Sequence, residues 1–321
     1  MIVIKLVGGL ASQLHKYAVA KSIAERYSKK LKVDLSAYES MEENNVMYYG
    51  LPNIGFNPLV ANEQDLSNAK GLTRLGNYLY FIDDALREIY FFNRLTKKIL
   101  NKIESRDITR GMLYKNFLKI HISDSTSLDW IEDVGQSKNC YVAAEFGLRF
   151  DIIDSIRNEL REKVINANIS NRAEIYLKKI KESPVSISLH VRRGDYVTNK
   201  NANIFHGVCD ESYYRKALKR YEATQEAQVF IFSDDIEWVK KEYRSFLPEK
   251  TVFISHNENY EDFILMTNCS HHIIANSGFS SIAAWLSGSY ESNIISPARW
   301  FIHEETNQNQ MEMLPKGWVY I

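Results

Sequence analysis

Apolar and polar positions alternate most regularly over residues 185–191, VSISLHV. A period of two predicts a buried strand, and it places His190 and Arg192 on the same face. The turn that follows, residues 192–195, contains two arginines, a glycine and an aspartate. Ligands of open α/β sheets bind at the carboxyl ends of strands, so this turn indicates an anion site. A solvated surface turn with a single ion pair is the alternative interpretation.

A second predicted strand, residues 228–233, ends at two adjacent carboxylates, Asp234 and Asp235. The pair could clamp a metal ion, or one carboxylate could accept hydrogen bonds from the N–H groups of a guanine edge. A purely structural alternative is that Asp235 or Ser233 caps the helix that begins near Ile236. The residues leave these three interpretations open.

A third predicted strand, residues 271–275, runs into a helix start that is rich in small hydroxyl side chains. Free backbone N–H groups, hydroxyl donors and the positive end of the helix dipole coincide there, which makes a site for phosphate. N-capping accounts for one serine in this turn but not for three. The turn consists of Asn276, Ser277, Gly278, Phe279, Ser280 and Ser281.

Helical patterns separate these three predicted strands, which indicates a parallel sheet in residues 184–321. Right-handed crossovers would bring the three strand ends to one edge of that sheet. A cationic turn, a carboxylate and a phosphate-binding helix start on one edge describe a site for a nucleoside diphosphate. The residues indicate this ligand class but not a reaction.

The N-terminal pattern predicts a strand over residues 2–7, a tight turn at Gly8 and Gly9, and a helix over residues 10–28. The turn lacks the G-x-G-x-x-G pattern of dinucleotide-binding folds, which disfavours nicotinamide or flavin binding. It still directs backbone N–H groups and the side chain of Ser12 toward the carboxyl end of a strand.

The remaining chain predicts two domains. Residues 36–130 give a poor pattern, in which a core-facing helical insertion over residues 78–103 is the main element expected. Residues 148–181 predict one or two amphipathic helices, and the proline that follows them ends the helical pattern. The expected domains are therefore residues 1–183 and residues 184–321, and the second contains the predicted nucleoside diphosphate site.

Composition and charge narrow the function classes. The 321 residues are 45% apolar and 25% charged, as in ordinary globular proteins. Lysine plus arginine equals aspartate plus glutamate at 40 each, so no overall basic charge attracts nucleic acid. Any anion site must therefore be local.

Targeting, membrane and redox signals are weak. The three cysteines, Cys140, Cys209 and Cys269, show no CxxC spacing, which disfavours a zinc site or a disulfide framework and favours a reducing compartment. The apolar N-terminus lacks the features of a leader and is interpreted as the first strand. No stretch approaches the roughly 20 apolar residues that span a bilayer, so we expect a soluble or at most peripheral protein.

Five stretches resemble, in order, the motifs of the α-1,2-fucosyltransferase family, glycosyltransferase family 11: GGLASQLHKYA, HVRRGDY, HGVCDESYY, FIFSDD and ANSGFSSIAAWL. The HxRRxD motif alone is moderately specific, whereas the ordered set is strong, and only residues 36–130 match poorly. The resemblance implies a GT-B fold of two Rossmann-like domains with a cleft between them, in which residues 1–183 form the acceptor side and residues 184–321 bind the donor. It also implies GDP-fucose as donor, a galactose O2 acceptor, inversion at the sugar C1, and no required metal or cofactor.

The resemblance further implies roles for individual residues. Arg192 resembles the arginine that holds the diphosphate, with His190 and Arg193 beside it. Asp195 resembles the residue that braces the turn, and Asp234 the residue that reads guanine. The second phosphate-binding loop is implied at Ser277, Phe279, Ser280 and Ser281, with Asn276, Ser12 and Asp235 as further donor-binding candidates and Gly8 and Gly9 as the glycine turn facing the cleft.

A general base for the acceptor hydroxyl is not identified by the sequence. Asp195, His206 and Asp210 are the candidates, although a highly dissociative transition state would need little base assistance. His206 lies in a predicted polar loop, residues 197–212, where a solvated histidine is the structural alternative. Arg192, Asp195 and His206 are therefore the candidate catalytic residues.

The chain departs from the family pattern at two places. Residues 11–13 are Ala-Ser-Gln where the family usually has Gly-Asn-Gln, and residues 281–282 are Ser-Ile where it has an aromatic pair. A different acceptor, or a different sugar on the same nucleotide, is therefore left open. Two rival functions also remain: a nucleotide-sugar transferase that uses Asp234 and Asp235 with a metal, and a non-catalytic GDP-binding protein.

The family resemblance also implies a partner and a location. The acceptor would be a glycan, which can be lipid-linked as part of a surface polysaccharide such as O-antigen. Such an acceptor would place the protein in the cytoplasm, at the inner face of the membrane.

Overall fold

The structure is a computed structural model, and it describes residues 1–39, 48–70, 120–121, 128–143, 147–222, 224, 226–290 and 293–321. Contacts divide the chain into two compact units. The N-terminal unit comprises Met1–Val7, Val19–Asn45 and Pro58–Phe146, and the C-terminal unit comprises Gly8–Ala18, Val46–Asn57 and Gly147–Ile321. The boundary predicted at residue 183 lies inside the C-terminal unit.

The described part of the N-terminal unit contains a parallel sheet with the strand order β2-β1-β4-β3. The first strand is fully buried at Ile2, Val3 and Ile4, as expected where helices cover both faces of a parallel sheet. The strand and the helix predicted at the N-terminus are confirmed as β1 and α1, whereas the helix predicted over residues 78–103 lies outside the described residues. The elements are β1 (Ile2–Lys5), α1 (Leu10–Arg26), β2 (Leu31–Asp34), α2 (Ser36–Glu39), α3 (Glu63–Lys70), β3 (Ile120–His121), α7 (Asp129–Gln136) and β4 (Cys140–Val142).

The C-terminal unit contains a second parallel sheet with the order β10-β9-β8-β5-β6-β7. This is the order of a doubly wound fold, in which the winding direction reverses between β5 and β8. Ligands bind in such folds outside the carboxyl ends of the two strands at the reversal. The strands are β5 (Val185–Val191), β6 (Ala227–Ser233), β7 (Thr251–Phe253), β8 (His271–Ile273), β9 (Ile294–Ser296) and β10 (Val319–Tyr320), and they confirm the three strands predicted from the sequence.

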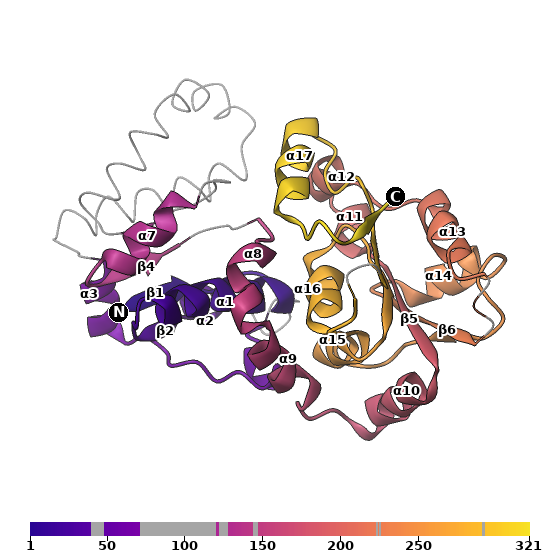
Figure 1. The fold of residues 1–321 in the computed structure, drawn as a ribbon, viewed down its shortest axis with the longest axis horizontal. Coiled ribbons are helices and arrows are strands. Elements are labelled where there is room, and N and C mark those ends of the chain that lie inside the picture. Colours follow the sequence, from indigo (N-terminus) through magenta and orange to yellow (C-terminus); the bar gives the residue numbers. More distant parts are fainter. Residues whose placement is uncertain are drawn as a thin grey trace. The chain divides into compact units, whose positions relative to one another are not determined.

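Helices cover both faces of the second sheet (Figure 1). The pair α13 (Glu211–Lys219) and α14 (Ile236–Tyr243) packs on one face, and the pair α15 (Asn259–Thr267) and α16 (Gly278–Leu286) lies on the other. Further helices are the 3₁₀ turns Leu51–Ile54 and Asp154–Ile156, α8 (Phe150–Ile153), α9 (Arg157–Ile165), α10 (Asn171–Glu182) and α17 (Glu304–Met313). No helix among the described residues combines the length and apolar character needed to cross a membrane.

Strand β5 shows how alternation divides the two faces. Ile187, Leu189 and Val191 are buried in the core with α13 and α14. The polar residues between them face the other way, and the buried hydroxyl of Ser188 lies 2.7 Å from Nδ1 of His272 on β8. Because this polar pair is satisfied across the two central strands, it fixes their alignment without leaving a buried group unpaired.

The prediction of a polar loop over residues 197–212 is wrong. This segment forms the end of α11 (Gly194–Thr198), the helix α12 (Lys200–His206) and the start of α13. The Asn199 side chain accepts hydrogen bonds from the N–H groups of Asn201 and Ala202, which caps α12. An asparagine cap therefore starts a helix where composition suggested an irregular loop.

Candidate functional site

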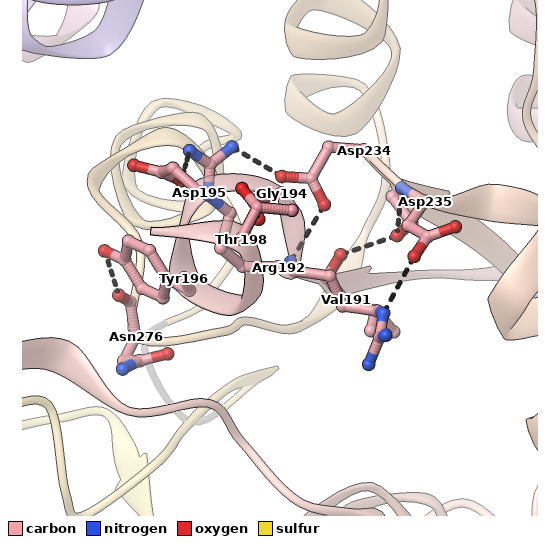
Figure 2. A network of polar contacts seen from close by, with 11 residues as sticks. Val191, Arg192, Gly194, Asp195, Tyr196, Thr198, Asp234, Asp235 and Asn276 are labelled. Carbon is pink, nitrogen blue, oxygen red and sulfur yellow. Dashed lines mark hydrogen bonds and ion pairs between the residues drawn. The ribbon is translucent and has the colours of Figure 1, made fainter. Parts of the chain in front are cut away.

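Two carboxylates hold the guanidinium of Arg192 in the turn after β5 (Figure 2). Its Nη2 donates to Asp195 Oδ1 at 2.5 Å, and its Nη1 lies 2.8 Å from Asp234 Oδ2. The arginine side chain remains 31% exposed. Because a guanidinium carries five N–H donors, the two carboxylates orient the group and leave further donors for a ligand.

Asp234 joins the end of β6 to the arginine turn. Its Oδ1 accepts a hydrogen bond from the backbone N–H of Arg193 at 2.8 Å, while Oδ2 faces Arg192. This position of the carboxylate depends on glycine at position 194, because a Cβ there would lie 2.5 Å from Asp234 Oδ2 and would displace it. The structure thus shows Asp234 as a support of the turn, and its implied role in reading guanine stays a prediction.

The side chain of Arg193 contacts the N-cap residue and the first turn of α14. Its Nε donates to Asp235 Oδ2 at 3.0 Å, and its guanidinium carbon lies 3.4 Å from the centroid of the Trp238 ring. Asp235 occupies the N-cap position of α14, but its carboxylate makes no capping hydrogen bond. The donor-binding roles of Arg193 and Asp235 stay predictions, and the sequence reasoning missed Trp238.

Tyr196 connects the arginine turn to the turn after β8. Its hydroxyl donates to the backbone carbonyl of Asn276 at 3.2 Å (Figure 2). Asn276 is itself buried, and its Nδ2 donates to the carbonyls of His206 and Trp300 at 3.0 and 3.2 Å. The segments that follow β5 and β8, predicted to lie at one edge of the sheet, are therefore joined by a direct hydrogen bond.

The hydroxyl groups of the α16 turn are engaged inside the turn. The side chains of Ser280 and Ser281 are fully buried, and both donate to the carbonyl of Ser277, at 3.3 and 2.7 Å. Ser277 is the N-cap residue, although its hydroxyl makes no capping hydrogen bond. The donors that this turn offers to an anion are therefore the backbone N–H groups of the first helical turn, which have no intrahelical partner.

His190 carries a buried polar atom without a partner. Its side chain is 5% exposed, and its Nδ1 has no hydrogen bond within the described residues. Burial, with a smaller effect of nearby Arg192, lowers the pKa of His190 to about 3, so the imidazole is neutral at pH 7. Its ring centroid lies 5.9 Å from that of Phe279 in α16, which places the imidazole where β5 approaches α16.

The three candidate bases differ in their surroundings. Asp195 is paired with Arg192, and Asp210 caps α13 by accepting hydrogen bonds from the N–H of Tyr213 and the hydroxyl of Ser212. His206 is half-buried, and its ring stacks on Tyr196 at 4.4 Å with an interplanar angle of 6°. Burial lowers the pKa of His206, Asp195 opposes that shift, and Arg192 adds to it. His206 is therefore a neutral imidazole near pH 7.

The N-terminal glycine turn belongs to the C-terminal unit. Gly8 has a φ of 84°, a left-handed conformation that favours glycine, whereas a Cβ at Gly9 would meet no atom within 4 Å. Gln13 is fully buried and clamps the turn: its Nε2 donates to the carbonyls of Gly8 and Tyr48, and its Oε1 accepts from the N–H of Gly50. The predicted donor contacts of Gly8, Gly9 and Ser12 stay predictions, and the sequence reasoning missed the clamp.

The described residues contain no group of three or more His, Cys, Asp or Glu side chains placed to hold a metal ion. The two adjacent carboxylates that could clamp a metal accept instead from the arginine turn. In this arrangement Asp234 and Asp235 each face a positive charge supplied by the chain.

Comparisons with known proteins reveal relatives over the whole chain. The sequence model described as glycosyl transferase family 11 matches residues 1–321. An alpha-1,2-colitosyltransferase of Escherichia coli is 30% identical over 326 residues, covering 100% of this chain and 99% of that protein. The O-antigen biosynthesis glycosyltransferase WbnK of Escherichia coli is 34% identical over 195 residues, covering 57% of this chain and 62%, less than two thirds, of that protein. Among solved structures, the fucosyltransferase NodZ from Bradyrhizobium aligns with a TM-score of 0.46 and 15% identity, covering 88% of this chain and 92% of that one.

Proposed function

The chain belongs to glycosyl transferase family 11, and we propose that it transfers fucose from GDP-fucose to the O2 hydroxyl of a galactose in a glycan, with inversion at the fucose C1. One observation carries the proposal. The Arg192 guanidinium is held by two carboxylates at the end of β5, in the turn that Tyr196 joins by a hydrogen bond to the segment between β8 and α16. These are the two strand ends at which a doubly wound sheet binds ligands.

The leaving group determines what the site must do. As the bond between C1 and the diphosphate oxygen breaks, its electrons stay with GDP and negative charge grows on the diphosphate. Arg192 offers N–H donors not used by its carboxylates, and the α16 turn offers backbone N–H groups aligned with the helix dipole. A preorganised donor of this kind contributes roughly 10² to 10³ in rate.

We propose that His206 is the general base that accepts the proton of the acceptor hydroxyl. When the galactose oxygen bonds to C1, its proton must leave, and a neutral imidazole can accept it. Asp195 forms an ion pair with Arg192, and Asp210 accepts the hydrogen bond that caps α13. His206 is neutral, and its ring stacks on Tyr196, which follows the arginine turn. His206→Gln should lower kcat without changing the KM for the donor.

We propose that no metal ion takes part. The support is that Arg192 and Arg193 already face the Asp234 and Asp235 carboxylates, so a cation there would compete with two guanidiniums. Transfer measured in excess EDTA should equal transfer in buffer alone. Complete loss of activity in EDTA, restored by a divalent ion, would favour the rival metal-assisted transferase.

The nucleotide and the sugar are tested separately. A thermal-shift series with GDP, UDP and ADP should show selective stabilisation by GDP, because a ligand that binds the folded state raises Tm by mass action. Turnover of GDP-fucose with release of GDP should follow, whereas GDP binding without turnover would favour a non-catalytic protein. GDP-colitose is the second candidate donor, because a relative that aligns over the whole chain is a colitosyltransferase. The ratio of kcat/KM for the two donors decides between them.

We also propose a cytoplasmic location and an acceptor that is part of a lipid-linked surface polysaccharide. The support is the O-antigen biosynthesis role in the name of WbnK, together with three cysteines that are free thiols. A comparison of kcat/KM for a lipid-linked galactoside and the same glycan without lipid tests the acceptor. Equal kcat/KM values for the two acceptors would show that the enzyme does not recognise the lipid.

A further inference from the structure

A group of aromatic rings extends outward from the arginine turn of the C-terminal unit. The guanidinium carbon of Arg192 lies 5.3 Å from the centroid of the Tyr196 ring, on which His206 stacks. The centroids of Phe301 and Phe205 lie 5.1 and 4.8 Å from that of His206. These ring contacts connect the proposed diphosphate site with a more distant part of the same unit.

The outer end of this group is open to solvent. Phe205 is 48% exposed, and the neighbouring Ile302, whose N–H donates to the carbonyl of Phe205, is 44% exposed. Phe301 is half-buried and packs against Phe205 with centroids 5.0 Å apart. Exposed apolar side chains that lie next to one another form a patch, and contiguous apolar patches mark interaction sites.

The chemistry of the reaction selects the occupant. The charged part of the donor fits Arg192 and the α16 turn, whereas Phe205, Phe301 and Ile302 carry no charge in their side chains. The remaining reactant is the acceptor glycan, whose pyranose rings have an apolar C–H face that gains dispersion contacts on a flat aromatic ring. The half-buried imidazole of His206 contacts Tyr196 of the arginine turn on one side and Phe301 on the other. In this position it can bind a sugar hydroxyl.

We propose that Phe205 and Phe301 form the acceptor subsite, on which the C–H face of a pyranose packs with its attacking hydroxyl beside His206. This inference rests on the proposed glycosyl transfer and deepens it by placing the acceptor on the C-terminal unit. It assigns a binding function to α12 and to the loop after β9, neither of which is needed to hold the diphosphate. A lipid surface is the competing occupant, because Ile204 next to Phe205 is also 60% exposed.

The test compares three variants with the wild type. Phe205→Ala removes the exposed ring, and Phe205→Tyr keeps it. Tyr290→Ala is the matched control, because Tyr290 is 82% exposed and precedes β9, at the opposite edge of the sheet from the strand ends. Three quantities are measured for each protein: the KM for acceptor, the KM for GDP-fucose and the rate of donor hydrolysis without acceptor. The acceptors are a panel of glycosides that includes methyl β-galactoside.

The expected result is a rise of roughly fivefold to tenfold in the acceptor KM of Phe205→Ala, the scale of one lost aromatic contact. Its donor KM and its donor hydrolysis should stay at wild-type values, and Phe205→Tyr should recover most of the acceptor affinity. Tyr290→Ala should match the wild type in all three measurements.

Three results would overturn the subsite. The acceptor KM of Phe205→Ala could equal that of the wild type, or its donor KM could rise equally, which would indicate a donor or structural role. Thirdly, Phe205→Ala could lose co-sedimentation with anionic lipid vesicles while keeping its acceptor KM, which would assign the patch to a membrane. If the wild type binds GDP but glycosylates no member of the panel, the proposed function itself fails, and the subsite fails with it.

Discussion

Replacement of Gly194 by alanine tests whether Asp234 positions the arginine that stabilises the leaving group. The added Cβ would lie 2.5 Å from Asp234 Oδ2, closer than unbonded atoms can remain, and 3.2 Å from Cγ, which is a tight contact. The carboxylate must therefore move away from the turn. Movement of Asp234 breaks its contacts with Arg192 Nη1 and with the backbone N–H of Arg193, both 2.8 Å long.

The size of the effect follows from those two contacts. A hydrogen bond to a charged group contributes about 1.5 to 3 kcal/mol when it is well shielded from water. The arginine and aspartate side chains here are 31% and 26% exposed, so solvent screening reduces the pair to about 2 kcal/mol in total. Because the contacts position the catalytic guanidinium, we expect kcat to fall roughly 30-fold. Asp195 still holds Arg192, which prevents a complete loss.

The assay is a double-mutant cycle on kcat with Gly194→Ala, Asp234→Ala and the double variant. If alanine at 194 acts by displacing the carboxylate, it should do little harm once the carboxylate has been removed. The double variant should therefore resemble Asp234→Ala alone, with circular dichroism confirming that all three variants fold. The reasoning would be refuted if the fold-losses in kcat of the two single variants multiplied in the double variant. A wild-type kcat in Gly194→Ala would refute it as well.

Further predictions concern the same turn and the buried imidazoles. Arg192→Ala should lose roughly 10² to 10³ in kcat while staying folded, and Arg192→Lys should be nearly as poor because a point charge cannot contact two carboxylates and a phosphate in one plane. Tyr196→Phe removes the hydrogen bond to Asn276 and should lower kcat about fivefold, with the thermal midpoint little changed. Because the pKa of His206 lies below its usual 6.5, kcat/KM should be flat above pH 7 and fall as acid protonates this base below 6.5, a limb that His206→Gln abolishes. His190 and His272 are buried, and burial lowers their pKa values to about 3. Below pH 6.5 the unfolded chain therefore binds protons that the folded chain does not. The free energy of unfolding, measured with urea, should fall as the pH drops from 6.5.

The elements that the sequence predicted are those whose signals are local. Alternation over residues 185–191 predicted β5 with both of its ends, and the adjacent carboxylates predicted the end of β6. Small residues after β8 predicted the start of α16. Each signal arises within a few neighbouring residues, so no knowledge of distant contacts was needed.

The contacts that organise the site depend on pairs far apart in the chain. The approach of Asp234 to Gly194 joins residues 40 positions apart, and nothing near the glycine indicates it. Trp238 beneath Arg193, and His206 on Tyr196, likewise depend on how strands and helices pack. The cap at Asn199 was a local signal that polar composition concealed, because asparagine is common both in loops and at helix starts.

The register between β5 and β6 decides whether the anion site exists. Val191 pairs with Ser233, and the Ser233 hydroxyl donates to the Val191 carbonyl at 2.7 Å, so both strands end at the same level. The residues that follow, Arg192 and Asp234, then meet as an ion pair, and the N–H of Arg193 reaches the same carboxylate. A slip of one residue would turn one strand's side chains to the opposite face. The arginine would then keep only Asp195, its partner within the turn, which cannot fix a guanidinium relative to the rest of the sheet.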